Sequence, residues 1–492
     1  MARRLTARHD TMRTMAQVRQ ALSSLSGFPE WLPSGHIVEQ HFVDILRRTF
    51  ELHGFSGIQT RAVEPLSELT KKGETSKEVY LLSRLQADPA DAESETDPRK
   101  QLGLHFDLTV PFARYVVDNA GLLTFPFKRY QIQKVWRGER PQEGRFREFI
   151  QADIDIVGDG ALPLHHDVEV PLIMHEALSA LPVPAVTIHV SNRKVAQGFY
   201  QSIGIDTDRL IEVLRVVDKL DKIGPEKVAA ELTQSVGVSA QQAAQALRLA
   251  TITGTDGQDV SDQVLRALAG AEPTELLNEG LAELTALLEA TGRRRPGAVI
   301  ADLKIARGLD YYTGTVYESF MAGHEDLGSV CSGGRYDSLA TNGKRTFPGV
   351  GISIGLSRLL ARVIGGGLVE VSRSVPTAVL VAVTDEAHRC ASDAIADALR
   401  ARGISADVAP SAAKFGKQIK AADKRSIPFV WFPGADGEPD SVKDIRSGEQ
   451  VEADAATWQP PTADAAPRIS ASPAAACSQD GGQDGCEVGS AS

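Results

Sequence analysis

The segment KRYQIQKVWRGERPQEGRFREFIQADIDIVG, residues 128–158, decides the fold of this chain. Two runs in which polar and apolar residues alternate flank the turn-rich stretch ERPQEGR, and this order is typical of a long antiparallel β-hairpin. Hairpins build antiparallel sheets, whereas Rossmann sheets are mainly parallel. The segment therefore predicts an antiparallel central sheet and argues against a Rossmann fold.

Charged side chains crowd the middle of this hairpin: Arg137, Glu139, Arg140, Arg145 and Arg147. Alternation predicts that Arg137 and Glu139 share one face of their strand. Because the flanking residues are aromatic or apolar, we expect the arginines to line a cleft. Several guanidinium groups that converge on a cleft suit a polyphosphate, since each offers a planar fork to phosphate oxygens. A salt-bridged surface hairpin is the alternative.

The second strand of the hairpin carries Gln151, Asp153 and Asp155 at alternate positions. Asp107 and Thr109 in HFDLTVP are expected to repeat this arrangement on another strand. Polar acceptors on one face of an apolar strand suggest a pocket for an amino or imidazole group. A sheet face exposed to solvent explains the pattern equally well.

A glycine-rich turn, PGVGISIGLSRLL at residues 348–360, precedes a predicted helix that contains Arg358. Its glycines permit close backbone approach, but their spacing is not the GxGxxG of dinucleotide sites. The sequence holds no GxxxxGK[ST] phosphate loop and no HExxH, and we interpret no segment as a nucleophile elbow. Any use of ATP must therefore depend on the arginines.

Size and composition fit an ordinary multidomain protein: 492 residues, a net charge of −11 and 42% hydrophobic residues predict two to four domains. No apolar run approaches the roughly 20 residues that span a bilayer. The four cysteines form no CxxC pair, so we expect neither a zinc site nor a disulfide framework. The simplest setting for such a chain is a reducing cytoplasm. The acidic balance disfavours indiscriminate nucleic-acid binding but permits a local basic surface for one RNA.

The hydrophobic periodicity of the sequence changes along the chain and indicates its domains. Periodicity predicts a helix over 36–54, a helical insertion over 193–292 and a compact α/β unit from 376. The basic N-terminus resembles a transit peptide in composition, but we expect a solvated arm. The predicted parts are the arm 1–21, a first catalytic segment 22–192, the insertion 193–296, a second catalytic segment 297–370, the α/β domain 376–456 and a disordered tail 460–492.

One further stretch is unusual, ARGLDYYTGTVYE at 306–318, which places Arg307, Tyr311 and Tyr312 close together. With the segments above, it resembles class II aminoacyl-tRNA synthetases, specifically the histidyl-tRNA synthetase family. WRGERPQEGRFREF resembles motif 2, GVGISIGLSRLL motif 3 and residues 39–61 motif 1, while ARGLDYYTG and SGGRYDSL resemble the two histidine signatures. The resemblance covers roughly residues 22–455, and Arg61 replaces the usual motif 1 proline.

The resemblance implies an α+β fold: a class II antiparallel-sheet catalytic domain with a helical insertion, and a C-terminal α/β anticodon-binding domain. It implies attachment of histidine to its tRNA through histidyl-adenylate, with ATP and Mg²⁺, in a cytoplasmic homodimer without membrane contact. Mg²⁺ would bridge the outer phosphates of ATP, with no dedicated metal site.

Each role that the resemblance implies falls on a residue of this sequence. Arg137 and Arg307 would be catalytic and contact the α-phosphate, and Arg307 would also border the histidine. The other implied contacts are Arg145 or Arg147 and Arg358 with the outer phosphates, Glu139 with the adenine, Asp107, Thr109 and Gln151 with the α-ammonium of histidine, Asp155 and Tyr312 with the imidazole, Tyr311 and Tyr336 as pocket walls, and Arg140 and Gln142 with the tRNA acceptor end.

Three other classes of protein share parts of this pattern. A regulatory paralogue that serves ATP phosphoribosyltransferase would sense histidine without catalysis, but it would lack the domain at 376–456 and an intact RGLDYYTG. A non-catalytic pseudo-synthetase domain would have lost Arg137, Arg307 or Gln151. A proline or threonine enzyme of the same class would carry a different amino-acid pocket.

Overall fold

A computed structural model describes residues 20–21, 25–70, 78–85, 97, 100–142, 144–305, 311–434 and 438–472. The described chain forms two compact units. One is built chiefly from Val43–Arg362, and the other from Glu30–Phe42 and Val363–Cys477. Arg307, most of the N-terminal arm and the tail beyond residue 472 lie outside the described residues.

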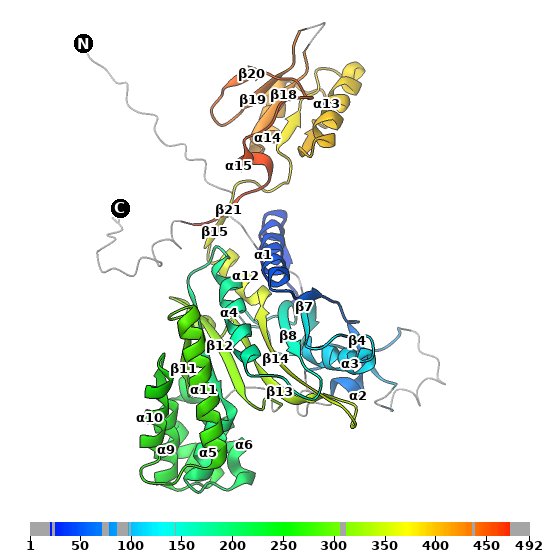
Figure 1. The fold of residues 1–492 in the computed structure, drawn as a ribbon. Helices are drawn as coiled ribbons and strands as arrows, with labels where there is room; N and C mark the ends of the chain where they lie inside the picture. Colours follow the sequence, from blue (N-terminus) through cyan, green and yellow to red (C-terminus); the bar gives the residue numbers. More distant parts are fainter. Residues whose placement is uncertain are drawn as a thin grey trace, which may run out of the picture. The chain divides into compact units, whose positions relative to one another are not determined.

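A nine-stranded sheet forms the centre of the first unit (Figure 1). In the order in which they pair, its strands are β10 (Thr253–Gly254), β11 (Val299–Asp302), β9 (Val186–Asn192), β12 (Thr315–Met321), β13 (Cys331–Thr341), β14 (Thr346–Gly355), β8 (Glu148–Val157), β7 (Phe127–Trp136) and β3 (Ser56–Gly57). Only the pairs β11–β9 and β3–β7 are parallel. The predicted antiparallel sheet is confirmed.

The hairpin that decides the fold is β7 and β8, which pair from Phe127↔Val157 to Trp136↔Glu148. Residues 137–147 lie in the connection between them, so Arg137 and Glu139 do not share a strand face as predicted. The strand ends at Trp136 because the chain turns there to meet other partners: the Arg137 N–H still bonds Arg147 O, but the Gly138 N–H bonds Glu78 O. The charged cluster is therefore a loop.

The segment HFDLTVP is a helix start and not a strand. The α-helix α3 is Thr109–Asn119, and the Asp107 carboxylate accepts a hydrogen bond from the Val110 N–H at 3.1 Å. An aspartate beside the first turn satisfies an amide that has no partner within the helix. This local hydrogen bond outweighs the alternation on which the strand prediction relied.

The other helices and the small sheet of this unit frame the central sheet. The predicted helix over 36–54 is confirmed as α1 (Pro33–Leu52), and SRLL lies at the start of α12 (Leu356–Gly365), as predicted. A separate three-stranded sheet follows motif 1. The remaining elements here are β4 (Val63–Pro65), α2 (Leu66–Leu69), β5 (Leu81–Leu82), β6 (Leu102–Leu104) and α4 (His165–Ser179).

Arg61, which stands in place of the motif 1 proline, has a structural partner. Its Nη2 lies 2.7 Å from Glu64 Oε2, and Arg114 Nη2 lies 2.9 Å from Glu64 Oε1. Glu64 is fully buried, so it needs such partners. The substitution therefore links the motif 1 segment to α3.

Residues 193–294 are mainly helical, as predicted. Asn192 ends β9 and caps the first of these helices by accepting from the Lys194 N–H. Its amide also donates to Glu283, which binds Lys194 Nζ at 2.6 Å. The helices are α5 (Arg193–Ser202), α6 (Leu210–Val217), α7 (Leu220–Ile223), α8 (Pro225–Glu231), α9 (Ala240–Ala250), α10 (Gly257–Ala267) and α11 (Glu275–Arg294).

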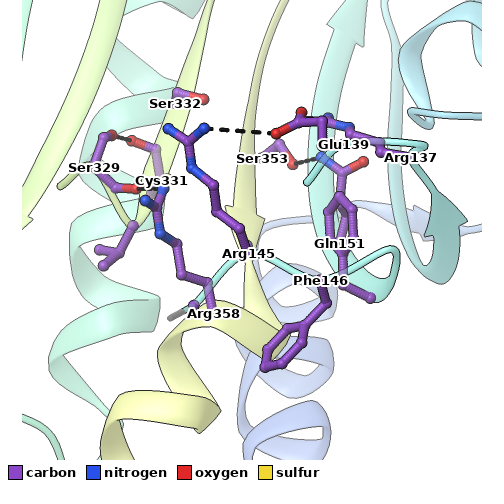
Figure 2. A pocket seen from close by; sticks show the side chains of 14 residues that line it. Arg137, Glu139, Arg145, Phe146, Gln151, Ser329, Cys331, Ser332, Ser353 and Arg358 are labelled. Carbon is purple, nitrogen blue, oxygen red and sulfur yellow. Dashed lines mark hydrogen bonds and ion pairs between the residues drawn. The ribbon is translucent and has the colours of Figure 1, made fainter. Parts of the chain in front are cut away.

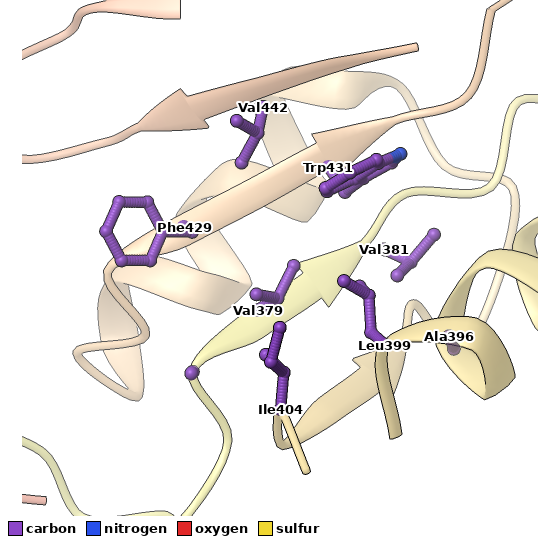
Figure 3. Close-up of a cluster of buried hydrophobic side chains, with 9 residues drawn as sticks. Val379, Val381, Ala396, Leu399, Ile404, Phe429, Trp431 and Val442 are labelled. Carbon is purple, nitrogen blue, oxygen red and sulfur yellow. The ribbon is translucent and has the colours of Figure 1, made fainter. Parts of the chain in front are cut away.

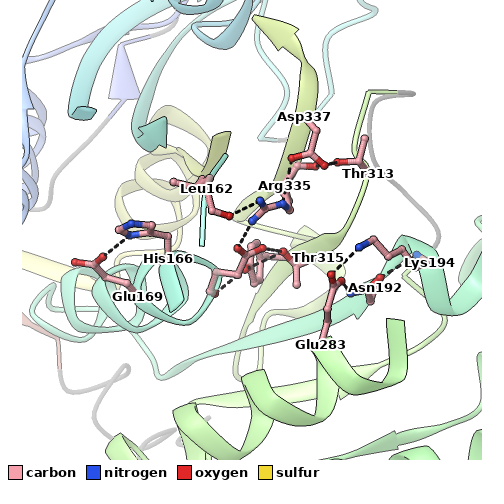
Figure 4. A network of polar contacts seen from close by, with 12 residues as sticks. Leu162, His166, Glu169, Asn192, Lys194, Glu283, Thr313, Thr315, Arg335 and Asp337 are labelled. Carbon is pink, nitrogen blue, oxygen red and sulfur yellow. Dashed lines mark hydrogen bonds and ion pairs between the residues drawn. The ribbon is translucent and has the colours of Figure 1, made fainter. Parts of the chain in front are cut away.

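A buried polar network fastens α4 to β12 and β13 (Figure 4). The Asp167 carboxylate has no exposed surface and accepts from Arg335 Nη1 at 2.7 Å and from the Thr315 hydroxyl. Arg335 also donates to Leu162 O at 2.6 Å and to Asp337. The SGGRYDSL signature thus places Arg335 and Asp337 in a structural network and leaves Tyr336 on the other face of β13.

The second unit holds the predicted strand–helix–strand pattern as a five-stranded sheet. Trp431 is fully buried at its centre, beside Val379 and Leu399 (Figure 3). The strands, in pairing order, are β17 (Ala406–Val408), β16 (Val379–Val381), β18 (Phe429–Phe432), β19 (Ser441–Asp444) and β20 (Gln450–Glu452), with helices α13 (Arg389–Ala401) and α14 (Phe415–Lys424). Its helices and strands agree with the prediction of an α/β domain.

The prediction of disorder from residue 460 is wrong for the part of the tail that is described. Residues Thr462–Ala465 form α15, and β21 (Ile469–Ala471) pairs with β15 (Val369–Val371). The buried Arg373 donates to Asp464 O at 2.9 Å. A composition poor in large apolar residues does not reveal such main-chain pairing, which needs no bulky side chains.

No helix in the described ranges is both long and apolar enough to span a lipid bilayer.

Candidate active site

A pocket of about 230 Å³ opens beside the β7–β8 connection (Figure 2). Its walls come from that connection, from the ends of β8, β13 and β14, and from the first turn of α12. The lining residues are Arg137, Glu139, Gly144, Arg145, Phe146, Phe149, Gln151, Ser329, Val330, Cys331, Ser332, Ser353, Gly355 and Arg358.

Three arginines converge on this pocket, which agrees with the predicted cleft. Arg145 Nη1 lies 3.6 Å from Glu139 Oε2, and Arg137 Nη1 lies 3.9 Å from Glu139 Oε1. Arg358 Nη1 donates to Ser329 O at 2.9 Å. Because Glu139 is the only carboxylate among these lining residues, the described lining carries net positive charge. Such a pocket suits an anionic ligand with several oxygens.

Arg147, one of the two predicted partners for the outer phosphates, does not line the pocket. Its Nε donates to Glu139 O at 3.2 Å and its Nη1 to Ser26 O at 3.5 Å, so the side chain supports the loop from outside. Of the two alternatives, Arg145 is the one that the pocket contains. Arg140 and Gln142 are exposed at the tip of the loop.

The residues predicted to surround an imidazole form a second group, made of Asp155 and three tyrosines. Tyr336 Oη donates to Asp155 Oδ1 at 2.8 Å. The ring centroids of Tyr311 and Tyr312 are 4.7 Å apart, and those of Tyr311 and Tyr336 are 6.2 Å apart. Asp155 and Tyr336 are buried. The structure thus brings together the residues that the sequence predicted around an imidazole.

Two glycines of β14 make room for this group. A Cβ added at Gly351 would lie 2.1 Å from Asp155 Oδ1, and one added at Gly349 would lie 2.5 Å from the Tyr336 ring. Both positions face the same side of β14, because side chains alternate along a strand. The glycines of the motif 3 segment therefore serve the buried polar group and not a nucleotide turn.

Gln151 connects the two groups, since it lines the pocket and lies on the same strand as Asp155. Its Nε2 donates to Ser353 Oγ at 2.7 Å, whereas its buried Oε1 has no hydrogen-bond partner within the described part of the chain. A buried amide oxygen without a partner is suited to accept from a bound ammonium. Thr109 is half-buried, two residues after Asp107 at the start of α3.

The alternative of a solvent-exposed sheet face is wrong, because Gln151, Asp153 and Asp155 are all buried. Burial also keeps the tyrosines protonated. It raises the pKa of Tyr312, and the nearby carboxylates Asp155 and Asp107 raise it further. The pKa of Tyr336 is raised by burial and by Asp155. Both hydroxyls can therefore donate a hydrogen bond at any ordinary pH.

Sequence reasoning missed several residues of the site: Arg129, Ser353 and Cys331 entirely, and Asp153 as a named ligand contact. Arg129 on β7 is the cross-strand partner of Asp155. Only the register of the hairpin shows this, and alternation alone does not fix register. Cys331 directly precedes the SGGRYDSL signature on β13, and Ser353 is the single hydroxyl residue of GVGISIG on β14, so neither position stood out in the sequence.

Asp153 yields a prediction for stability. Burial raises its pKa from 3.8 to about 7, opposed by Arg129. Between those values the folded chain keeps a proton that the unfolded chain has lost, so this group makes stability fall as pH rises through that window. We expect Asp153→Asn to remove a decline on the order of 4 kcal/mol, at about 1.4 kcal/mol per pKa unit. Urea unfolding at a series of pH values measures it, and parallel curves for variant and wild type would contradict it.

One predicted site residue falls outside the described part of the chain. Arg307 falls within 306–310, outside the described residues, so its place relative to the pocket stays a prediction. Glu318 lies on β12 and lines a different, smaller cavity with Asp221 and Lys304.

Comparisons with known proteins show which family this chain resembles over most of its length. The profile of the histidyl-tRNA synthetase family matches residues 27–359, and that of an anticodon-binding domain matches residues 377–456. The chain is 58% identical over 456 residues to a Cutibacterium acnes protein named histidine–tRNA ligase, covering 91% of this chain and 98% of that protein. A Micrococcus luteus protein of the same name is 58% identical over 455 residues, covering 91% of this chain and 98% of that protein. The crystal structure of a Nostoc histidyl-tRNA synthetase aligns with a TM-score of 0.77 at 37% identity, covering 88% of this chain and 97% of that one.

Proposed function

The chain belongs to the histidyl-tRNA synthetase family, and from this premise we propose which of its residues perform the reaction. It is a class II histidine–tRNA ligase, which attaches L-histidine to its cognate tRNA through histidyl-adenylate at the expense of ATP. Relatives at 58% identity carry this name over nearly the whole chain, so the histidine-sensing regulatory paralogue is the less supported alternative.

In the first step of the reaction, the arginines would stabilise negative charge on the phosphates of ATP. When the histidine carboxylate attacks the α-phosphate, negative charge builds up on the phosphate oxygens, so fixed cations lower the barrier. Arg137 holds the α-phosphate, and Arg145 and Arg358 hold the outer phosphates. Their convergence on one pocket whose described lining contains one carboxylate supports these roles. Arg307 would face Arg137 across the α-phosphate, a role that the family resemblance alone supports.

The nucleotide would bring its own metal. Class II synthetases use ATP with a divalent cation. We expect a Mg²⁺ ion to accompany ATP, where it would neutralise part of the charge of the outer phosphates beside Arg145 and Arg358. Glu139 contacts the adenine.

The buried group beside the pocket would select the amino acid. Asp155 accepts from one imidazole nitrogen and the Tyr312 hydroxyl bonds the other, with Tyr311 and Tyr336 as walls. Gln151, Asp107 and Thr109 hold the α-ammonium. A site whose buried polar groups are paired only by histidine rejects other amino acids strongly, because they would leave those groups unpaired.

The observation that carries this assignment is the position of Gln151, whose buried amide borders both the arginine pocket and the strand of Asp155. It would place the α-carboxylate of histidine beside the α-phosphate. We expect amino-acid-dependent ATP–pyrophosphate exchange with histidine and with none of the other standard amino acids. Exchange with proline or threonine would contradict the pocket assignment. Histidine binding without exchange would indicate the regulatory alternative.

The tRNA would contact both compact units. The exposed Arg140 and Gln142 would meet its acceptor end, and the 377–456 domain would read its anticodon.

We also propose a homodimer, because four leucines on and beside the β4–β6–β5 sheet stay exposed: Leu81, Leu82, Leu85 and Leu102. Sedimentation over a range of protein concentrations tests this.

A cytoplasmic location agrees with the free thiols of Cys331 and Cys390, since such thiols persist in a reducing compartment.

A further inference from the structure

Arg129 is a buried cation that the reaction described above does not use. It lies on β7 directly opposite Asp155 of β8, and its side chain has no exposed surface. Its Nη2 lies 2.7 Å from Asp155 Oδ2 and 3.9 Å from Asp153 Oδ2. The guanidinium carbon lies 4.3 Å from the centre of the Phe112 ring.

The surroundings of Arg129 are costly for a charge. Its Nε and Nη1 have no hydrogen-bond partner within the described part of the chain. Removing a guanidinium from water costs free energy that one ion pair seldom repays in full, and a well-packed apolar residue would usually be at least as stable. A contribution to folding therefore explains Arg129 poorly. The contact with Asp155 points to the site instead.

The positive charge of Arg129 and the negative charges of the carboxylates near it nearly balance. Burial raises the pKa of Asp153 to about 7, so below neutrality this carboxyl is mainly uncharged. Asp107 is engaged at the start of α3 and would face the α-ammonium. Among the described residues, the remaining charges of the imidazole subsite are then Arg129 and Asp155. The described titratable groups that face this pair are Asp107, Asp153, Tyr311, Tyr312 and Tyr336, and the three tyrosines are held neutral by burial.

We propose that Arg129 is a specificity-determining residue that balances the charge of Asp155, so that the site takes histidine with a neutral imidazole and excludes the imidazolium ion. This inference rests on the proposed histidine site. Asp155 is held through Oδ2 by Arg129 and through Oδ1 by Tyr336. Tyr312 faces the other ring nitrogen with a hydroxyl that can donate. Arg129 touches no substrate and acts through Asp155.

A cation in the subsite has a measurable consequence for pH dependence. Free histidine gains its ring proton near pH ~6.5, so a site that accepts only the neutral ring loses ligand below that pH. Without the guanidinium, Asp155 would leave the subsite with net negative charge. Such a subsite would attract the imidazolium ion, because opposite charges favour each other strongly in a buried site.

The test is the pH profile of the KM for histidine in pyrophosphate exchange. For the wild type we expect KM to rise about tenfold per pH unit below about 6.5. Arg129→Met should raise KM at least about tenfold near pH ~8, remove the rise in acid and leave the KM for ATP unchanged. Arg129→Lys should retain the wild-type slope. Lys134→Met is the matched control, since Lys134 is a half-exposed cation on the same strand.

Several outcomes would overturn the inference. One is a folded Arg129→Met protein whose KM for histidine follows the wild-type pH profile. Another is an equal rise in both KM values with an unchanged profile, which would make Arg129 merely structural. If Arg129→Met does not fold, calorimetry of histidine binding to the wild type near pH ~6, in buffers of different ionisation enthalpy, decides. Binding should release protons, and proton uptake or no exchange would refute the proposal. Absence of histidine-dependent exchange in the wild type would instead refute the proposed function.

Discussion

Replacing Arg137 by alanine should lower the kcat of histidine-dependent pyrophosphate exchange by about 10²–10³-fold. A preorganised donor to the charge that develops in a transition state is worth about that factor. The Arg137 side chain is held for this task by its Nε–H bond to Phe106 O at 3.0 Å and by the Phe149 ring, 5.1 Å from the guanidinium carbon. Arg137→Lys should recover only part of the rate, because an ammonium lacks the planar fork.

Arg140→Ala provides the matched control, since Arg140 lies three residues away and is exposed at the loop tip. Pyrophosphate exchange needs no tRNA, so this variant should exchange within a few-fold of the wild type. Its aminoacylation of tRNA should fall. Equal exchange rates in Arg137→Ala and Arg140→Ala, with both proteins folded, would remove Arg137 from the reaction. Arg307→Ala should resemble Arg137→Ala.

The largest effect on stability should follow Asp167→Ala. The Asp167 carboxylate is fully buried between α4, β12 and β13, and its loss removes the buried partner of Arg335, which keeps Leu162 O and the more exposed Asp337 (Figure 4). Breaking a buried ion pair from one side costs about 3–5 kcal/mol. Urea unfolding of the purified variant measures the loss. The site should be affected too, because Arg335 is the neighbour on β13 of Tyr336, which donates to Asp155.

The exposed pair of Asp159 and Arg345 is the matched control, with an Nη2–Oδ2 distance of 2.6 Å and both side chains nearly half exposed. Asp159→Ala should cost less than about 1 kcal/mol, because solvent screens such pairs. The double variant Asp167→Ala with Arg335→Met should recover part of the loss, since the largely buried guanidinium is then removed as well. A loss for Asp167→Ala no larger than that for Asp159→Ala would contradict the role assigned to the network.

Local patterns predicted those parts of the molecule that depend on near neighbours. The hairpin, α1, the turn into α12 and the α/β domain all follow from periodicity over a short range. The helix start at Asp107 was misread because one side-chain hydrogen bond to the Val110 amide outweighs alternation over a few residues. The strand pairing of β21 was missed because it uses main-chain groups.

The site shows the same division. Arginines gathered in one loop were recognisable, and Gln151 and Asp155 stood out as polar residues on an apolar strand. Which arginine of the loop lines the pocket depends on where the loop turns, and this separated Arg145 from Arg147. Arg129 could not be found from sequence, because its meaning depends on which residue of β8 lies opposite.

The pairing of β15 with β21 brings together the two chain segments that flank the anticodon-binding domain. Val371 and Ile469 are direct partners, and partners in antiparallel strands lie about 4.5–5.5 Å apart. The 97 residues between them therefore leave and return at the same place, as an insertion does. One or two residues could join the cut ends after excision, or another RNA-reading module could be grafted there. The strand pair therefore closes this stretch of the chain into a loop at its base.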